Sequence, residues 1–198
     1  MPKLINASQA KVIETIFKNP GINLTGIIEK TKLSPNYVSN YVNFLSKKNI
    51  LREERLEKKR VYLRRFFLNL KSSLGKNIFT LFKEEEKEFF FKKYPKLTPI
   101  LSQLSELKGI EFIVVYGSYA KFTAETDSDL DLLMVGKGIN KERAREVLVN
   151  LEMEVSIKIE TLKIFIKRIN EPLHKQILKD NILIYGSGKF VNLLSRFH

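Results

Sequence analysis

Three stretches near the start of the chain repeat their apolar residues every three or four positions, which is the spacing of an amphipathic helix. Each stretch follows a residue that can cap a helix N-terminus, and the third also has a proline in its first turn. We therefore predict three short helices. Their capping residues and apolar stretches are Ser8 with Val12–Phe17, Asn23 with Leu24–Ile28, and Ser34 with Val38–Leu45.

Two strands are predicted directly after these helices. Residues 50–55 and 60–65 mix β-branched, aromatic and charged side chains on either side of a charged turn at 56–59. Such a pattern is typical of a β-hairpin. Residues 66–70 continue the second strand or begin a linker, and residues 71–108 are expected to be a helical connector. In it, Ile78–Lys93 is predicted as a helix that Tyr94-Pro95 interrupts, and Thr98-Pro99 begins another helix through Leu107.

The rest of the chain alternates short apolar strands with amphipathic helices, so we predict an α+β fold. The predicted strands are 112–116, 129–135, 154–160 and 182–186. The predicted helices of this region are 140–153, 161–169, 171–179 and 188–196.

The formal net charge of +13 is concentrated at one end of the chain. Residues 1–76 hold 16 basic and 5 acidic side chains, whereas residues 77–198 hold 19 and 17. A basic N-terminal third is typical of a nucleic-acid-binding module joined to a domain with a different task. A solubilising surface rich in Lys and Glu is the alternative, but it does not explain why the excess lies at one end.

Composition excludes several classes of protein. A hydrophobic content of 43% excludes a disordered chain, and the absence of cysteine excludes a disulfide scaffold and a thiolate zinc site. With two histidines, any metal is expected to have oxygen ligands, which favours Mg²⁺. No apolar run approaches the roughly 18 residues of a membrane span. Because Met1-Pro2-Lys3 begins no signal peptide, we expect a cytoplasmic protein.

Three helices followed by a basic hairpin resemble a winged helix-turn-helix, a family of DNA-binding domains. The resemblance implies that the third helix enters the major groove of double-stranded DNA and that the hairpin, or wing, contacts phosphates. The helix residues expected at the DNA are Asn36, Tyr37, Ser39, Asn40, Asn43 and Lys47. The expected wing residues are Lys58, Lys59, Arg60 and Arg64. A dimerisation or docking module is the alternative, and a homodimer is expected because many such DNA readers bind paired half-sites.

A cluster of short carboxylates is the most informative motif. An apolar strand ends in Gly117-Ser118, ten residues follow, and Asp129-Leu130-Asp131-Leu132 begins the next strand. Alternation along a strand places Asp129 and Asp131 on the same face, where they repel each other unless a cation lies between them. Gly117 allows the backbone to approach an anion, and Ser118 can offer its hydroxyl and amide to a phosphate.

This motif resembles the signature of the DNA polymerase beta-like nucleotidyltransferases, and particularly their minimal members, over roughly residues 108–190. The resemblance implies that Asp129 and Asp131 hold Mg²⁺ against the triphosphate of a nucleotide, ATP being the first guess. It also implies that Gly117 and Ser118 bind the phosphates while a hydroxyl attacks the α-phosphate and pyrophosphate leaves. Lys121, one helical turn after Ser118, is expected to add positive charge to the phosphate site, a solvated lysine being the alternative.

The third carboxylate that the family usually supplies is expected near Ser156 and is absent. Glu154, two residues earlier on the same face of the strand, is the best substitute, and we group it with Asp129 and Asp131 as the catalytic set. Glu160 is the second choice, and a solvated strand position is the alternative for both. His174 is expected on a surface helix without a catalytic role.

These observations predict a winged helix at 1–70, a helical connector at 71–108 and a nucleotidyltransferase-like domain at 109–198. We expect a DNA-binding protein that transfers a nucleoside monophosphate from a Mg-NTP to a hydroxyl acceptor. The alternative is a transcription regulator whose second domain senses nucleotide or docks a protein without catalysis. Some minimal nucleotidyltransferases act as antitoxins on a HEPN-type partner, and nothing in the sequence is specific for that role.

Overall fold

A computed structural model describes residues 5–58 and 61–197 of the chain. The chain divides into two compact units, one formed by Met1–Phe82 with Val191–His198 and the other by Lys83–Phe190. The predicted connector is shared between them, because the boundary falls within one long helix. Each unit is described separately.

The first unit begins with the three predicted helices. They are α1 (Ala7–Lys18), α2 (Leu24–Thr31) and α3 (Pro35–Lys47). Asn23 and Ser34 cap α2 and α3 as predicted, whereas α1 is capped by Asn6 and not by Ser8. Asn6 and Gln9 form a reciprocal capping box that satisfies the first free amide groups and starts the helix earlier.

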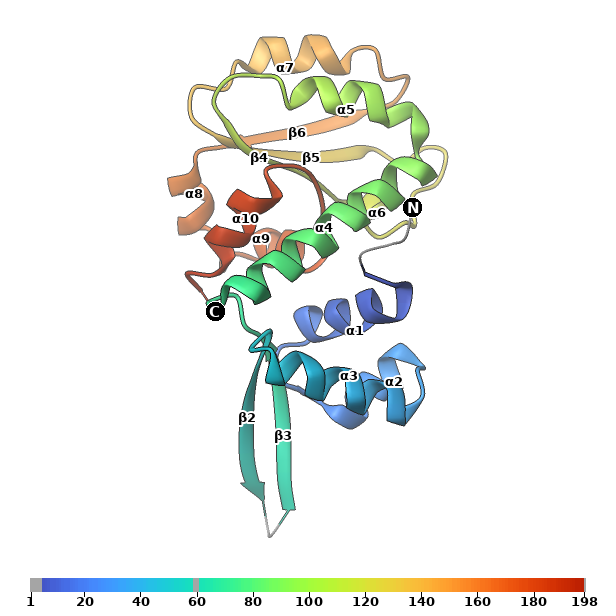
Figure 1. Ribbon diagram of the computed structural model, residues 1–198. Coiled ribbons are helices and arrows are strands. Elements are labelled where there is room, and N and C mark those ends of the chain that lie inside the picture. The colour runs from blue at the N-terminus through green and yellow to red at the C-terminus, as the bar shows by residue number, and fades with distance from the viewer. Residues whose placement is uncertain (1–4, 59–60, 198) are drawn as a thin grey trace. The chain divides into compact units, whose positions relative to one another are not determined.

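A three-stranded sheet completes this unit (Figure 1). The predicted hairpin consists of β2 (Leu51–Lys58) and β3 (Val61–Leu68), which pair from Leu51↔Leu68 to Lys58↔Val61. β2 is longer than predicted because residues 56–58 of the predicted turn continue the ladder. β3 is longer because residues 66–68 pair with residues 51–53 at the other end of the hairpin. A short strand that the sequence did not predict, β1 (Ile22–Asn23), pairs with the other side of β3.

The connector is more helical than predicted. Ser72 accepts a hydrogen bond from the amide of Gly75, so α4 (Ser73–Lys93) begins five residues before Ile78, where the sequence prediction placed its start. A single 3-10 turn, η1 (Pro95–Leu97), follows the break at Tyr94-Pro95. The next helix, α5 (Thr98–Leu104), ends before the predicted Leu107.

The second unit is built on a mixed sheet of four strands in the order β6-β5-β4-β7. The strands are β4 (Ile110–Tyr116), β5 (Leu130–Gly136), β6 (Val155–Glu160) and β7 (Ile182–Tyr185). β4 is antiparallel to both of its neighbours, and β5 is parallel to β6. The predicted α+β fold is therefore confirmed.

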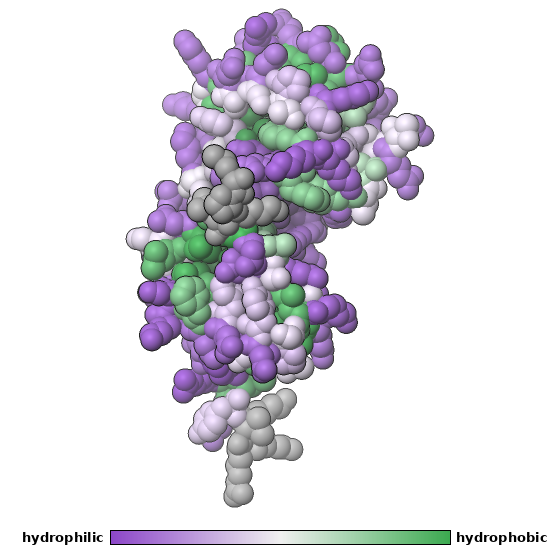
Figure 2. Space-filling model, turned by 45° about the vertical axis from the view of Figure 1, so that its right-hand side comes forward, coloured by the Kyte–Doolittle hydropathy of each residue, from purple (hydrophilic) through white to green (hydrophobic). Residues whose placement is uncertain are grey.

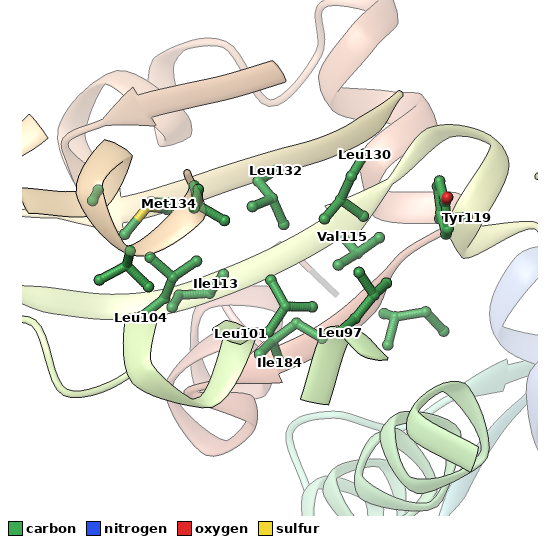
Figure 3. Packing of buried hydrophobic residues seen from close by; sticks show 14 of the residues in the cluster. Leu97, Leu101, Leu104, Ile113, Val115, Tyr119, Leu130, Leu132, Met134 and Ile184 are labelled. Carbon is green, nitrogen blue, oxygen red and sulfur yellow. The ribbon is translucent and has the colours of Figure 1, made fainter. Parts of the chain in front are cut away.

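Helices cover both faces of this sheet (Figure 1). On one face, Ile113, Val115 and Leu132 point toward α5 and lie in the cluster of buried side chains that Figure 3 shows. On the other face, the Phe112 ring packs edge-on against Phe165 and Phe190, at centroid distances of 5.3 and 5.2 Å. The remaining helices are α6 (Gly117–Ala120), α7 (Lys141–Leu148), α8 (Leu162–Lys167), α9 (Pro172–Lys179) and α10 (Ser187–Leu194).

Polar side chains dominate the surface. Figure 2 shows mostly hydrophilic residues on the face turned to the viewer, with hydrophobic residues in smaller patches among them. Within the described residues, no helix has both the length and the apolar composition needed to cross a membrane.

A buried ion pair holds the far end of β6, and it corrects the prediction for His174. This side chain is fully buried, not exposed on a surface helix, and its Nε2 atom lies 2.9 Å from Oε2 of Glu160. Arg168 and Lys158 approach Oε1 of Glu160 at 3.1 and 3.3 Å. Burial alone would raise the pKa of Glu160, but the hydrogen bonds and charges of His174 and Lys158 hold that pKa below its usual value.

We expect Glu160→Gln to lower the free energy of unfolding by about 3 kcal/mol at pH 7, because removing one member of a buried ion pair strands its partners. Since the folded-state pKa of Glu160 is lowered, its contribution is complete above the unfolded pKa of about 4.3 and is lost as pH falls through the folded value. Denaturant unfolding at pH 7 and pH 3 measures both effects.

The control is Glu171→Gln, which removes an exposed carboxylate that lies 3.9 Å from Nε of Arg168. Its expected effect is below about 0.5 kcal/mol. Equal losses for the two variants at pH 7 would contradict the assignment of the stabilisation to the buried pair.

Candidate functional site

A row of three side chains crosses the sheet where the predicted carboxylate motif lies. Tyr116 of β4 pairs with Asp131 of β5, and Asp131 pairs with Ser156 of β6. Paired residues point to the same face, so these three side chains are immediate neighbours. Asp129 lies two residues before Asp131 and just outside β5, at the edge of the same face.

Gly117 brings the backbone against one of these carboxylates. Its φ of 71° lies in the left-handed region, which turns the chain sharply from β4 into α6. A Cβ atom at this position would overlap Oδ2 of Asp131, so only glycine allows the close approach. The contact explains in physical terms why a glycine stands between the strand and Ser118.

Asp131 is electrostatically unsatisfied in the protein alone. Burial, and then the negative charge of Asp129, raise the pKa of Asp131 above its usual value. Tyr116 responds to the same environment, because burial followed by the charges of Asp131 and Glu160 raises the pKa of its phenol. A positive charge placed between Asp129 and Asp131 would relieve this repulsion.

Two sets of hydrogen bonds shape the loop between α6 and β5. The carbonyl of Ser118 accepts the amide of Thr123 at 3.0 Å, which closes the segment after α6. Glu125 and Ser128 then bond reciprocally, Glu125 N to Ser128 Oγ at 2.9 Å and Ser128 N to Glu125 O at 3.1 Å. This turn leads directly into Asp129, and the amide of Leu130 then binds the carbonyl of Glu154 at 2.9 Å.

An aromatic clamp holds the loop from outside. Lys93, at the end of α4, donates a hydrogen bond of 3.0 Å to the carbonyl of Phe122 and lies over the rings of Tyr94 and Phe122. The Phe122 ring stacks parallel to Tyr94 and meets Phe89 edge-on. Sequence reasoning left these residues as general packing, and Tyr116 was also missed as a neighbour of Asp131. Strand alternation gave the only signal for Tyr116.

The predicted metal site is incomplete in carboxylates. Among residues 5–58 and 61–197, no three His, Cys, Asp or Glu side chains come together in a group that could hold a metal ion. Asp129 and Asp131 are two carboxylates at the same end of β5, and Ser156 occupies the position beside Asp131 on β6. Glu154 is exposed and lies at the entry to β6, opposite Asp129 in the extended register. Lys121 is exposed at the end of α6.

Oxygen ligands from Asp129 and Asp131 fit a hard divalent cation such as Mg²⁺, which keeps several waters and takes further oxygens from a bound phosphate. Burial, and then the charge of Asp129, raise the pKa of Asp131, and a bound cation would offset the second of these effects. Asp129 and Asp131 are the two residues that would hold such a cation, and no third protein ligand is assigned to it.

The third helix of the first unit presents the predicted DNA-contacting residues on one side. Val38, Val42 and Leu45 form its buried face. Asn36, Asn40, Asn43 and Lys47, spaced three or four apart, lie on an exposed face, while Tyr37 and Ser39 are half-buried at its margins.

An aromatic row separates the exposed face of α3 from the buried one. Tyr41 stacks between Tyr37 and Phe44, at centroid distances of 6.1 and 6.2 Å. Burial, and then the neighbouring Tyr37, raise the pKa of Tyr41 to about 12, so its hydroxyl stays neutral at physiological pH.

Only part of the predicted wing can be placed. Lys59 and Arg60 lie outside the described residues, as does the side chain of Lys58. Arg64 is bound to both carboxylate oxygens of Glu53 at 2.9 and 2.7 Å and also donates to Asn43 at 2.9 Å. Its hydrogen bonds hold the pKa of Glu53 below the usual value. Arg64 therefore ties the wing to α3, and its charge is largely compensated.

Comparison with known families agrees with both halves of this description. Residues 96–189 match the family model described as polymerase beta nucleotidyltransferase, and residues 5–52 match the one described as winged helix-turn-helix DNA-binding. The nucleotidyltransferase match contains the Tyr116–Asp131–Ser156 row, and the winged helix match contains all of α3. Both predicted domains are confirmed, in the predicted order.

Individual relatives are distant. A candidate protein adenylyltransferase of Methanocaldococcus jannaschii is 27% identical over 85 residues, which cover 41% of this chain and 85% of that protein. A toxin–antitoxin crystallised with AMP-PNP is 16% identical and covers 50% of this chain and 82% of its own, with a TM-score of 0.40. MepR, a transcription regulator of the Staphylococcus aureus multidrug efflux pump MepA, is 18% identical. The match covers 51% of this chain and 81% of MepR, with a TM-score of 0.33. At these TM-scores the two structures assign no function.

Gly117→Ala and Gly138→Ala form a matched test of the close approach to Asp131. Both glycines have positive φ, 71° and 70°, but nothing lies within 4 Å of a Cβ at Gly138. We expect Gly138→Ala to cost about 1 kcal/mol of backbone strain. Gly117→Ala should cost a further 1–3 kcal/mol or so, because the new methyl displaces the Asp131 carboxylate.

The free energy of unfolding by denaturant measures both variants. Indistinguishable values would mean that the packing of Gly117 against Asp131 adds nothing beyond the backbone strain.

Proposed function

We propose that this chain, which combines a winged helix-turn-helix DNA-binding domain with a nucleotidyltransferase domain of the polymerase beta type, binds a nucleoside triphosphate with a divalent cation at Asp129 and Asp131. It transfers the nucleoside monophosphate to a hydroxyl acceptor. ATP with Mg²⁺ is the first pair to test, since the relative from Methanocaldococcus jannaschii carries the name of an adenylyltransferase.

The observation that carries this proposal is the contact between Gly117 and Asp131. It places the backbone that precedes Ser118 within van der Waals distance of an unsatisfied carboxylate. A phosphate chain bound along Gly117 and Ser118 would therefore lie beside Asp131, separated from it by the width of a cation. In this proposal the phosphate site at Gly117 and Ser118 and the cation site at Asp131 lie next to each other.

Each residue has a distinct task in the proposed reaction. Asp129 and Asp131 hold the cation, which when bound neutralises the triphosphate and polarises its α-phosphate. Gly117 and Ser118 fix the phosphates through backbone amide and hydroxyl groups. The acceptor oxygen forms a bond to the α-phosphorus, the bond to the bridging oxygen breaks and pyrophosphate leaves. Glu154 is the residue we assign to accept the hydroxyl proton.

A side-chain hydroxyl of a protein is the first acceptor to test, because the curated relative is a candidate protein adenylyltransferase. The winged helix would bring the transferase domain to a DNA site, where it would act on a bound partner. We further propose that the protein works as a cytoplasmic homodimer that recognises paired half-sites.

A second function is favoured by Ser156. It occupies the place on β6 beside Asp131 and brings no charge to it. A domain that binds a metal–nucleotide without turning it over would sense nucleotide and transmit that state to the DNA-binding domain. In this case the protein is a transcription regulator.

Isothermal titration of ATP into the protein should give Mg²⁺-dependent binding that is lost, by about 100-fold or more, in Asp131→Asn. A charge-assisted contact is worth roughly 1.5–3 kcal/mol, and loss of the cation removes more than one such contact. Because burial and Asp129 disfavour the charge of Asp131, the same variant should leave the nucleotide-free protein as stable or more stable, by up to about 1 kcal/mol.

Asp127→Asn is the matched control, since Asp127 is exposed in the preceding turn. Equal binding by Asp131→Asn and the wild type would contradict the nucleotide site. Incubation with ATP labelled on the α-phosphate then separates the two functions. Label transferred to protein supports the enzyme, and tight binding without any transfer supports the nucleotide sensor.

Lys47→Ala should weaken binding to DNA selected from random duplexes by a similar factor for all sequences, and reduce the slope of log affinity against log salt by about 1. Asn40→Ala should instead change discrimination by about 1–3 kcal/mol at one base pair. Fluorescence anisotropy at several salt concentrations measures both quantities.

Lys141→Ala, an exposed lysine at the start of α7, is the control for general loss of positive charge. A salt slope that is reduced as much by Lys141→Ala as by Lys47→Ala would mean that α3 is not the contacting helix.

A further inference from the structure

A lysine stands directly behind the Asp131–Ser156 pair on the face of the sheet that carries the candidate site. Lys158 pairs with Leu133, one row further along β5 and β6. Strand alternation places Lys158 on the same face as Ser156, and therefore on the same face as Asp131. The positions nearest to Asp131 on β6 are thus a neutral hydroxyl and then a cation.

The ammonium of Lys158 is available to a ligand. Its side chain is 29% exposed, although its Nζ atom lies 3.3 Å from Oε1 of Glu160. Glu160 has two further partners besides Lys158, since His174 and Arg168 lie 2.9 and 3.1 Å from its oxygens. Lys158 can therefore move toward an anion while the buried carboxylate keeps two partners.

The distances along the sheet allow such a movement. Two residues along a strand span about 6.6 Å and neighbouring strands lie about 4.8 Å apart, so the Cα atoms of Asp131 and Lys158 are roughly 8 Å apart. A lysine side chain reaches most of that distance with its four methylene groups. The hydroxyl of Ser156 is smaller than a carboxylate and brings no negative charge between Asp131 and Lys158.

We propose that Lys158 binds a phosphate oxygen of the nucleotide held at Asp129 and Asp131, and that the site therefore works with one divalent cation per nucleotide. The ammonium adds one positive charge to the two of the divalent cation, against the negative charge of the triphosphate. The inference rests on the proposed nucleotide site and specifies how its charge is balanced. It also explains why a neutral residue is suitable at Ser156. A carboxylate at that position would form an ion pair with Lys158 and compete with the phosphate for its ammonium group.

Titration of Mg-ATP into Lys158→Gln tests the contact. We expect the dissociation constant to rise about 10-fold to 100-fold, the range for a lost hydrogen bond between charged groups. Lys158→Arg keeps the charge and should bind within a few-fold of the wild type. Arg168→Gln is the matched control, since it also removes a cation from Glu160 but lies on another element, and its affinity should be unchanged. Circular dichroism verifies that each variant is folded.

Counting of bound Mn²⁺ by electron paramagnetic resonance, with a non-hydrolysable ATP analogue at saturation, tests the stoichiometry. We expect one Mn²⁺ per bound nucleotide in the wild type. Two ions per nucleotide would overturn the inference, as would wild-type affinity in a folded Lys158→Gln.

The failure of this inference can be told from failure of the nucleotide site itself. If the wild type binds Mg-ATP and Asp131→Asn does not, the site stands whatever the result for Lys158→Gln. If the wild type binds no nucleotide, the proposed site and the role of Lys158 are both wrong. Equal weakening in Lys158→Gln and Arg168→Gln would show that Lys158 acts only through Glu160, and would overturn direct contact.

Discussion

The close packing of Gly117 against the carboxylate of Asp131 is the constraint on which the arrangement of the second unit depends. The backbone at Gly117 has left-handed geometry, and any side chain there would occupy the position of Oδ2 of Asp131. The register of β4 and β5 must therefore place Tyr116 opposite Asp131, since a slip of one residue would turn the carboxylate into the core. The alternation that buries Leu130 and Leu132 on one face places Asp131 on the opposite face, at the start of β5.

Two carboxylates on this face show opposite electrostatic environments. Glu160 is buried among His174, Arg168 and Lys158, which compensate its charge. Asp131 lies on the neighbouring strand, four residues before Val135, the partner of Glu160. It is partly buried, and the charge that acts on it is that of another carboxylate, Asp129. A carboxylate whose charge is compensated, such as Glu160, stabilises the folded protein. A carboxylate that is repelled by a second one, such as Asp131, would be stabilised by a bound cation. This contrast is the reason for proposing Asp131 as a cation ligand and for assigning Glu160 to the scaffold.

Sequence patterns predicted the elements well where local signals are strong. Asn23 and Ser34 with Pro35 located two helices, and the apolar strands before Gly117 and after Asp129 located the centre of the second sheet. Signals that depend on distant residues were not accessible. His174 was placed on a surface because its helical spacing does not reveal Glu160, its partner on β6. β1 was missed because two residues have no periodicity, and it exists only through pairing with β3.

The residues of the candidate site could be predicted because they are close together in the sequence. Asp129, Asp131, Gly117 and Ser118 are close in sequence, so spacing alone brought them together. The balancing charge must come from β6, whose register against β5 no local pattern fixes. That register puts Ser156 beside Asp131 and Lys158 behind it. In the proposed site the two carboxylates hold the cation, and the cation and Lys158 together offset the negative charge of the triphosphate, so the proposed binding does not need the missing acid. Catalysis makes a further demand, because the attacking hydroxyl must lose its proton at a defined place, and the residue proposed for that task is Glu154, which directly precedes β6.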